Sequence, residues 1–224
     1  MAEKKAVIVG GHGKIALLSA PKLAEAGWSV DSLIRKPEQS ADVEAAQATP
    51  VVLDIETATV EDLQAAFAGA AAVVFSAGAG GGSPERTHAV DYEGAVRSMD
   101  AARAAGVERF VIVSYSRAGV DVDSLSEDDS FYPYAKAKHD ADARLKETEL
   151  DYTILGPGML TLEPGTGRIA LADAQGEPEQ DVKKETSRDN VAAVIAYVLD
   201  SGAASRRTVN FYDGDTPIAE ALAE

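Results

Sequence analysis

Lys5-Ala6-Val7-Ile8-Val9-Gly10-Gly11-His12-Gly13-Lys14-Ile15-Ala16 is the stretch that decides the fold class. Its apolar half has the composition of a buried strand, and its glycines allow a tight turn into a following helix. Free backbone N–H groups at the start of such a helix, with the positive end of its dipole, bind phosphate. We therefore predict that a dinucleotide binds at this turn. The residues expected to bind it are Gly10, Gly11, His12, Gly13, Lys14 and Ile15.

The rest of the chain alternates short apolar runs with longer helical patterns, which is typical of βαβ units and a parallel sheet. Further strands are expected at residues 28–34, 51–53, 72–75, 110–113 and 152–155. These patterns predict an α/β fold, a single Rossmann-type domain over residues 1–224 with a doubly wound parallel sheet. The expected strand order is 3-2-1-4-5-6, with room for a seventh strand. Residues 156–187 and 206–224 are expected to form a small C-terminal lobe on the substrate side.

Three local features carry their own predictions. Pro21 predicts a kink in the first helix, or a helix in two pieces, because a proline inside a helix removes a hydrogen bond and costs about 3 kcal/mol. One long helix is expected from Pro84 to Ala105. The acidic stretch from Asp121 to Asp129 is expected to be an exposed loop.

The composition limits the classes of partner. The 224 residues include 21 Lys and Arg against 37 Asp and Glu, a formal net charge of -16, which argues against a nucleic-acid partner. The sequence has no cysteine, which excludes disulfides and thiolate zinc sites and favours a cytoplasmic location. We expect no signal peptide, no membrane helix and no metal site at the scattered histidines. The expected partner is a small-molecule substrate, and the expected state is a monomer or weak homodimer.

The end of the second predicted strand bears on the type of cofactor. An acidic residue there would bind the ribose hydroxyl of NAD(H), whereas a basic one would accept the 2′-phosphate of NADP(H). The sequence has Arg35 and Lys36, so NADP(H) is preferred and NAD(H) is the alternative. The later strands add further residues expected to contact the cofactor: Asp54, Ile55, Ser76, Ala77, Gly78, Ala79, Ser114 and Lys138.

Two Tyr-x-x-x-Lys pairs follow the acidic stretch, Tyr132 with Lys136 and Tyr134 with Lys138. Each pair shares one helix face, but the pairs differ by about 200° around the helix, so only one can face the protein. Tyr134 and Lys138 continue into an apolar stripe through Leu145, which predicts that they are the buried pair.

A tyrosine beside a lysine can donate or accept a proton in catalysis. A phenol with a pKa near 10 is a weak proton donor or acceptor at neutral pH unless a cation lowers that pKa, and Lys138 would supply the cation. Tyr134 is then the predicted general acid toward a carbonyl, and Ser116 is preferred over Ser114 for holding the carbonyl oxygen. The residues expected to line the substrate pocket are Tyr115, Pro157, Gly158, Met159 and Leu160.

Together these pieces resemble the short-chain dehydrogenase/reductase superfamily, and more narrowly its small atypical NAD(P)H-binding, NmrA-like and epimerase/dehydratase-like members. The resemblance rests on residues 10–16, 90–95, 107–114, 137–138, 150–154 and 214–218. It implies cofactor or catalytic roles for Gly10, Gly13, Arg35, Ser116, Tyr134 and Lys138. Two positions depart from the family pattern. Gly156 stands where relatives have an arginine, and Asp91 stands near the place of an asparagine used in proton relay.

These observations lead to a functional hypothesis, an NADP(H)-dependent oxidoreductase that reduces a small carbonyl or quinone-like substrate by hydride transfer with Tyr134 as general acid. Two alternatives stay open. The first is a non-catalytic NAD(P)H redox sensor of the NmrA-like type, and the second is a flavin or bilin reductase that needs no tyrosine proton. The sequence does not identify the substrate.

Overall fold

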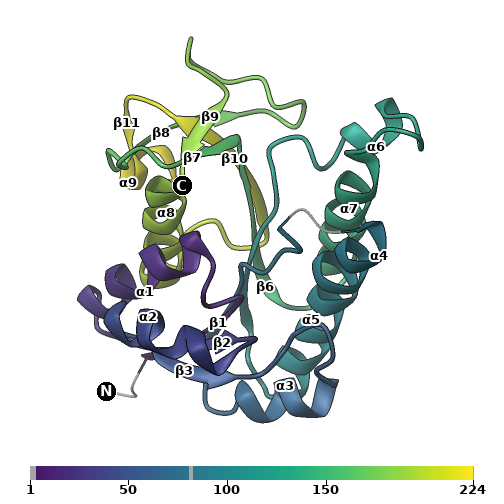
Figure 1. The fold of residues 1–224 in the computed structure, drawn as a ribbon. Helices are drawn as coiled ribbons and strands as arrows, with labels where there is room; N and C mark the ends of the chain where they lie inside the picture. Colours follow the sequence, from purple (N-terminus) through teal and green to yellow (C-terminus); the bar gives the residue numbers. More distant parts are fainter. Residues whose placement is uncertain (1–3, 81–82, 224) are drawn as a thin grey trace.

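The computed structural model describes residues 4–80 and 83–223, and its core is a nine-stranded sheet of order β11-β8-β10-β6-β5-β4-β1-β2-β3 (Figure 1). Six parallel strands have the predicted order: β1 (Lys4–Val9), β2 (Trp28–Ile34), β3 (Thr49–Val52), β4 (Ala72–Phe75), β5 (Arg109–Val113) and β6 (Asp151–Pro157). The seventh strand, β10 (Arg207–Asp213), is parallel to β6. Two antiparallel strands follow it at the edge, β8 (Arg168–Ala172) and β11 (Thr216–Pro217). The predicted doubly wound α/β fold is therefore confirmed.

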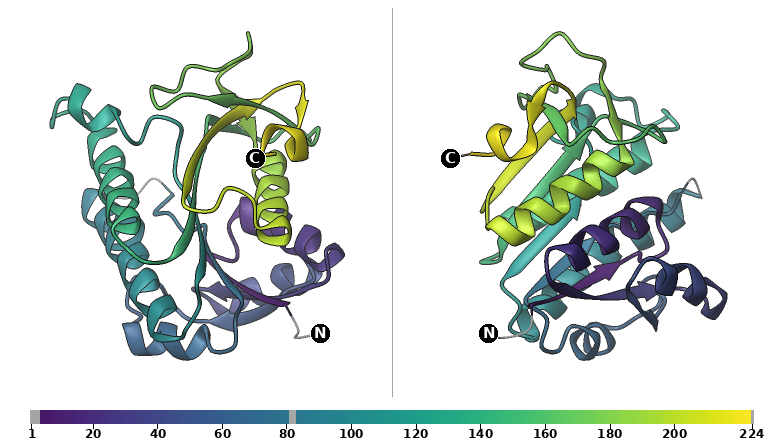
Figure 2. Two further views of the ribbon diagram at one scale, coloured as in Figure 1. Left: turned by 180° about the vertical axis from the view of Figure 1, so that it is seen from behind. Right: turned by 90° about the vertical axis from the view of Figure 1, so that its left-hand side faces the viewer.

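Helices cover both faces of the sheet (Figures 1 and 2). One face carries α1 (Lys14–Glu25), α2 (Ser40–Ala45), α8 (Arg188–Ser201) and α9 (Ile218–Ala221). The other face carries α3 (Val60–Ala66), α5 (Ala95–Ala104) and α7 (Tyr132–Lys146). Successive strand residues point to opposite faces, so in β1 Ala6 and Ile8 pack in the first layer while Val7 and Val9 pack in the second. Residues 6–9 of this strand are all apolar because both of its faces are covered there.

The helix α1 is continuous through Pro21, so the prediction of a helix in two pieces is wrong. Its buried side chains, among them Ala16, Ala20 and Leu23, pack in the core layer shared with α8. This packing holds the helix together against a proline cost of about 3 kcal/mol.

The predicted long helix from Pro84 to Ala105 has three parts. The segment α4 (Pro84–Thr87) is followed by a π-helix, η2 (His88–Gly94), and then by α5. The wider turn of η2 places the carboxylate of Asp91 inside the protein, where it accepts a hydrogen bond from the Ala79 N–H at 2.9 Å.

Several short elements were missed by the sequence reading. The acidic stretch contains α6 (Asp121–Ser124), and β2 is followed by a short 3₁₀ turn, η1 (Pro37–Gln39). In the C-terminal region, β7 (Met159–Thr161) pairs in parallel with β9 (Glu185–Ser187). Within the described residues, no helix is both long enough and apolar enough to cross a membrane.

Candidate active site

The glycine turn leaves the start of α1 open for an anion. The Gly11 N–H donates to the Leu33 carbonyl at 2.8 Å, and the Gly13 N–H donates to the Gly10 carbonyl at 2.9 Å. Gly13 is the N-cap of α1, so no side chain accepts from the first N–H groups, and the first helical turn has no acidic residue. These N–H groups and the helix dipole form an anion site that a phosphate fits.

Gly10 cannot be replaced without strain. Its φ is +83°, in the left-handed region, and an added Cβ would lie 2.6 Å from the Cα of Ala77. The turn therefore approaches the chain after β4 more closely than any side chain allows.

A cavity of about 240 Å³ lies beside this turn, at the carboxyl ends of the parallel strands. Most of the predicted cofactor residues line it: Gly10, His12, Gly13, Arg35, Asp54, Ile55, Ser76, Ala77 and Gly78. Four other predicted cofactor residues line a second cavity next to it: Ile15, Ala79, Ser114 and Lys138. The remaining three line neither cavity: Gly11, Lys14 and Lys36. The sequence reading missed three polar lining residues, Gln39, Glu56 and Arg86, which carry no motif signal.

The charged side chains around this cavity differ in whether they form ion pairs or hydrogen bonds. Arg35 is exposed and forms no hydrogen bond or ion pair with the described residues, so its guanidinium is available. Asp31, the nearby acid of β2, pairs with Lys5 at 3.4 Å. Arg86 pairs with Glu56 at 3.2 Å and donates to the Ala79 carbonyl at 2.7 Å. The unpaired cation at this cavity is thus the one at the end of β2.

His12 ties the turn to the segment after β2. Its Nε2 lies 2.7 Å from Asp42 Oδ2, and its Nδ1 lies 3.1 Å from Gln39 Nε2. Because the Gln39 amide nitrogen can only donate, Nδ1 accepts and Nε2–H donates to Asp42. This fixes the glycine turn against η1 and α2.

A second cavity, the catalytic cavity, has a volume of about 500 Å³ and shares Ser76, Ala77 and Gly78 with the first. It brings together six of the predicted site residues: Ile15, Ala79, Ser114, Tyr134, Lys138 and Leu160. Asp91 and Phe131 also line it. The cavity beside the glycine turn and the cavity of the Tyr134–Lys138 pair thus share a wall.

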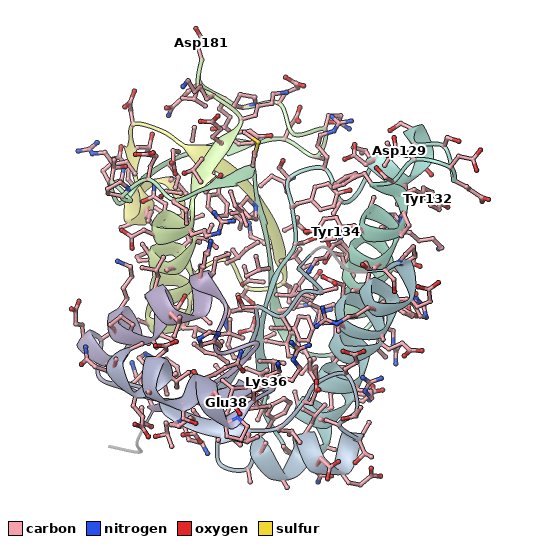
Figure 3. The ribbon with its side chains drawn as sticks, viewed as in Figure 1. Lys36, Glu38, Asp129, Tyr132, Tyr134 and Asp181 are labelled. Carbon is pink, nitrogen blue, oxygen red and sulfur yellow. The ribbon has the colours of Figure 1, made fainter. Side chains whose placement is uncertain are left out.

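Tyr134 and Lys138 are the pair that lines this cavity, as predicted, with Lys138 buried and Tyr134 half-buried. In Figure 3, Tyr134 lies on the side of α7 that faces the sheet, and Tyr132 lies on the outer side. Lys138 is 3% exposed, whereas Lys136 is exposed and pairs with Asp140 at 2.7 Å. The Lys138 ammonium lies 5.7 Å from the centre of the Tyr134 ring.

The charge of Lys138 is compensated inside the protein. Its Nζ lies 3.0 Å from Asp91 Oδ1 and donates to the Val113 carbonyl at 3.1 Å. Burial is the largest single effect and opposes the charge, but the Asp91 carboxylate, together with Tyr134 and Asp142, outweighs burial and holds the pKa of Lys138 above its usual value. Burial raises the pKa of the Tyr134 phenol, and Lys138 offsets this only in part. The expected net lowering of the phenol pKa is therefore wrong, because burial dominates.

Of the two candidate serines after β5, Ser114 lines the catalytic cavity and the preferred Ser116 does not. The Ser114 hydroxyl donates to Asp142 Oδ2 at 2.6 Å. Ser116 accepts instead from the Tyr212 hydroxyl at 3.1 Å, and its N–H donates to the Pro157 carbonyl. The reason is that β5 ends at Val113, so the first serine already lies beyond the strand.

Only one of the predicted substrate-pocket residues lines the catalytic cavity, Leu160. The Tyr115 ring packs against Phe131 and Tyr134 with centroids 5.6 Å from each, and it lines a different cavity. Pro157 is buried in β6, Gly158 packs against the ring of Tyr212, and Met159 is 66% exposed.

Comparison with known proteins also indicates a protein that binds NAD(P)H. A family model described as NAD(P)H-binding matches residues 10–202. The uncharacterized sugar epimerase YhfK of Bacillus subtilis (strain 168) is 36% identical over 97% of this chain and 98% of its own. The UPF0659 protein C216.03 of Schizosaccharomyces pombe is 34% identical over 97% of this chain and 93% of its own.

Solved structures agree with the sequence relatives. A Bacillus halodurans protein, provisionally named an NAD-dependent epimerase/dehydratase, superposes with a TM-score of 0.86, at 32% identity and 98% coverage of both chains. The oxidoreductase ylbE from Lactococcus lactis superposes with a TM-score of 0.83, at 30% identity, over 97% of this chain and 94% of its own. The family model and these relatives span most of the chain, so it belongs to the NAD(P)H-binding family, whose cofactor is a nicotinamide dinucleotide.

Proposed function

We propose that the protein is an NADP(H)-dependent oxidoreductase that reduces a small carbonyl or quinone-like substrate, with Tyr134 as the proton donor. The observation that carries this proposal is the shared wall of the two cavities at Ser76, Ala77 and Gly78. A dinucleotide held at the glycine turn would reach along this wall toward Tyr134 and Lys138.

The residues present fit such a cofactor. The uncapped start of α1 suits the diphosphate, and the unpaired Arg35 suits the 2′-phosphate that distinguishes NADP(H) from NAD(H). Asp54 and Ile55 line the same cavity as the turn and would flank the adenosine. When bound, the reduced nicotinamide supplies the hydride.

The remaining chemistry belongs to this chain's residues. The raised pKa keeps the Tyr134 phenol protonated at neutral pH, so it can donate as the substrate oxygen becomes negative. Lys138 stabilises the phenolate that results, because its charge lies close to the ring and is shielded from water. The Ser114 hydroxyl takes the role of orienting the substrate oxygen, and Leu160 contributes an apolar wall.

The test of the reaction is turnover of NADPH with a panel of aldehydes, ketones, quinones and nucleotide sugars by wild type and Tyr134→Phe. We expect kcat to fall about 10²-fold or more in Tyr134→Phe with unchanged NADPH affinity. Tyr132→Phe, on the outer side of the same helix, is the matched control and should keep wild-type turnover. Full activity of Tyr134→Phe would instead favour a flavin or bilin reductase. Tight NADPH binding with no turnover would favour a redox sensor.

The test of the cofactor is calorimetric titration with NADPH and NADH. We expect preferential NADPH binding, lost in Arg35→Ala. Lys36→Ala is the control, because Lys36 is next to Arg35 in the sequence but does not line the cavity. Equal affinity of the wild type for both nucleotides would refute the assignment of Arg35.

A further inference from the structure

A third cavity, of about 430 Å³, lies between α7, the loop after β5, the carboxyl-terminal end of β8 and the amino-terminal half of β10. Its polar lining consists of Tyr115, His139, Asp142, Lys146, Asp173, Thr208 and Asn210. Among the residues that the structure describes, it shares none with the catalytic cavity. It is therefore a separate, partly polar space behind the catalytic cavity.

One hydrogen bond joins the two cavities. Ser114 lines the catalytic cavity and Asp142 lines the third cavity, and the distance from the Ser114 hydroxyl to Asp142 Oδ2 is 2.6 Å. Asp142 is 6% exposed, and its other oxygen, Oδ1, has no hydrogen-bond partner among the described residues. A buried carboxylate normally has both oxygens satisfied, so this arrangement calls for an explanation.

The surroundings of Asp142 bring its carboxyl into a useful range. Burial raises the pKa to about 6, while the bond from Ser114 and the charges of Lys138, Lys146 and His139 oppose this rise. The other titratable groups that face it are Tyr115, Tyr134, Asp91 beside Lys138, and Asp173 across the third cavity. A carboxyl in this range gains and loses a proton readily near neutral pH.

The side of the catalytic cavity toward η2 does not offer such an exchange of protons with solvent. The Lys138 ammonium is directed at Asp91, which is 0% exposed and also accepts from the Ala79 N–H. This ion pair stabilises the charge of Lys138, but both of its side chains are buried. The route past Ser114 ends instead at an open cavity.

We propose that Ser114 and Asp142 form a proton path from the third cavity to the catalytic cavity, through which Tyr134 recovers the proton that it gives to the substrate. This inference rests on the proposed function. Once the Asp142 carboxyl is protonated, the hydrogen bond with Ser114 reverses and the carboxyl donates. Ser114 then passes its hydroxyl proton toward the Tyr134 phenolate, through the product oxygen or a water between them, and takes the proton of the Asp142 carboxyl. Asp142 then takes a proton from solvent in the third cavity. Each turnover thus consumes one solvent proton and one hydride from NADPH.

Steady-state kinetics at pH 7 with NADPH and an accepted substrate tests the path. In Asp142→Asn we expect kcat to fall about 10²-fold while the NADPH dissociation constant stays within about twofold of wild type. Asp140→Asn removes an exposed carboxylate two residues away on the same helix and should keep wild-type kcat. Equal kcat in the two variants would refute the path.

Chemical rescue separates proton transfer from a structural role. Sodium formate should restore at least about a tenth of the lost kcat in Asp142→Ala, because the small acid enters from the third cavity and replaces the carboxyl. It should not restore activity in Asp142→Ala combined with Ser114→Ala. No rescue in a folded, NADPH-binding Asp142→Ala would overturn the proposal.

A measurement without turnover keeps the test independent of the proposed function. In the NADPH-bound protein labelled with ¹³C at aspartate, the Asp142 carboxyl resonance should titrate between pH 4 and 8. Its pKa should rise in Ser114→Ala, because the hydrogen bond that favours the carboxylate is lost, and should stay unchanged in Ser116→Ala. A carboxyl that does not exchange its proton with solvent in this range refutes the path, even where no substrate has been found.

Discussion

The Lys138 ammonium lies 3.0 Å from the Asp91 carboxylate, in an ion pair whose side chains are 4% and 1% exposed. The two residues are distant in the sequence, Lys138 in α7 and Asp91 in η2, and both line the catalytic cavity. The pair therefore fixes the lysine of the candidate site by charge as well as by packing.

Breaking this pair should be costly. Asp91→Leu leaves a buried charge without its partner, so we expect a loss of about 3 to 5 kcal/mol in the free energy of unfolding, measured with urea. Adding Lys138→Met should restore most of that loss, because the unpaired charge is then removed. Asp140→Leu, which breaks the exposed pair with Lys136, should cost only about 0 to 1 kcal/mol. Equal losses in Asp91→Leu and Asp140→Leu would contradict the burial argument.

Gly10 and Gly27 offer a matched comparison, since both have a φ of +83°. An alanine at Gly27 meets nothing within 4 Å and should cost only the backbone strain of about 1 kcal/mol. Gly10→Ala should cost more in urea unfolding and should abolish NADPH binding in calorimetry. The reason is that its Cβ would displace Ala77, which lies on the wall between the two cavities. Wild-type NADPH affinity in Gly10→Ala would refute the turn as the phosphate site.

The parts of the fold that were predictable are those in which local pattern and tertiary structure agree. The strands at 28–34 and 72–75 have the predicted bounds. Residues 72–75 are an apolar run buried on both faces, whereas in 28–34, which follows Gly27, buried apolar residues alternate with polar ones. The inward face of α7 was likewise predictable from its apolar stripe.

The parts that were missed depend on interactions between distant residues. The π-helix η2 leaves no period in the sequence, and it exists where Asp91 turns inward to Lys138 and the Ala79 N–H. Ser114 lines the catalytic cavity in place of the predicted Ser116 because β5 already ends at Val113. No local pattern in the sequence marks that strand end. Pairing of β7 with β9 joins segments more than twenty residues apart across a loop rich in Gly, Pro and charged residues.

Arg109 is predicted to matter for stability alone. Its guanidinium, 9% exposed, donates to the carbonyls of Asp151, Val198 and Ala203, and burial lowers its pKa against the opposing charge of Asp151. It lies at the amino end of β5, the end opposite the candidate site.

Replacement of this arginine should therefore separate folding from binding. Arg109→Met leaves several carbonyls without donors, and we expect urea unfolding to show a loss of about 3 kcal/mol or more. The NADPH dissociation constant of the folded variant should equal that of wild type. Arg103→Met, on the exposed part of α5, should change neither quantity. A weakened NADPH affinity in folded Arg109→Met would show that the two ends of the sheet are coupled.

Asp142 should give the protein an unusual pH dependence of stability. Its pKa is raised from 3.8 to about 6 by burial, so between these values the folded state binds more protons than the unfolded state. Asp142 therefore stabilises the folded protein below pH 4. This contribution to the free energy of unfolding, about 3 kcal/mol in all, is lost as the pH rises through 6. Asp142→Asn cannot titrate, so its free energy of unfolding should rise relative to that of wild type by this amount between pH 4 and 7. Asp140→Asn, whose carboxylate is partly exposed, should show no such rise. If urea unfolding gave parallel curves for wild type and Asp142→Asn across this range, the carboxyl of Asp142 would be ionised at pH 4 in the folded protein, and the proton path through Ser114 would lose its donor.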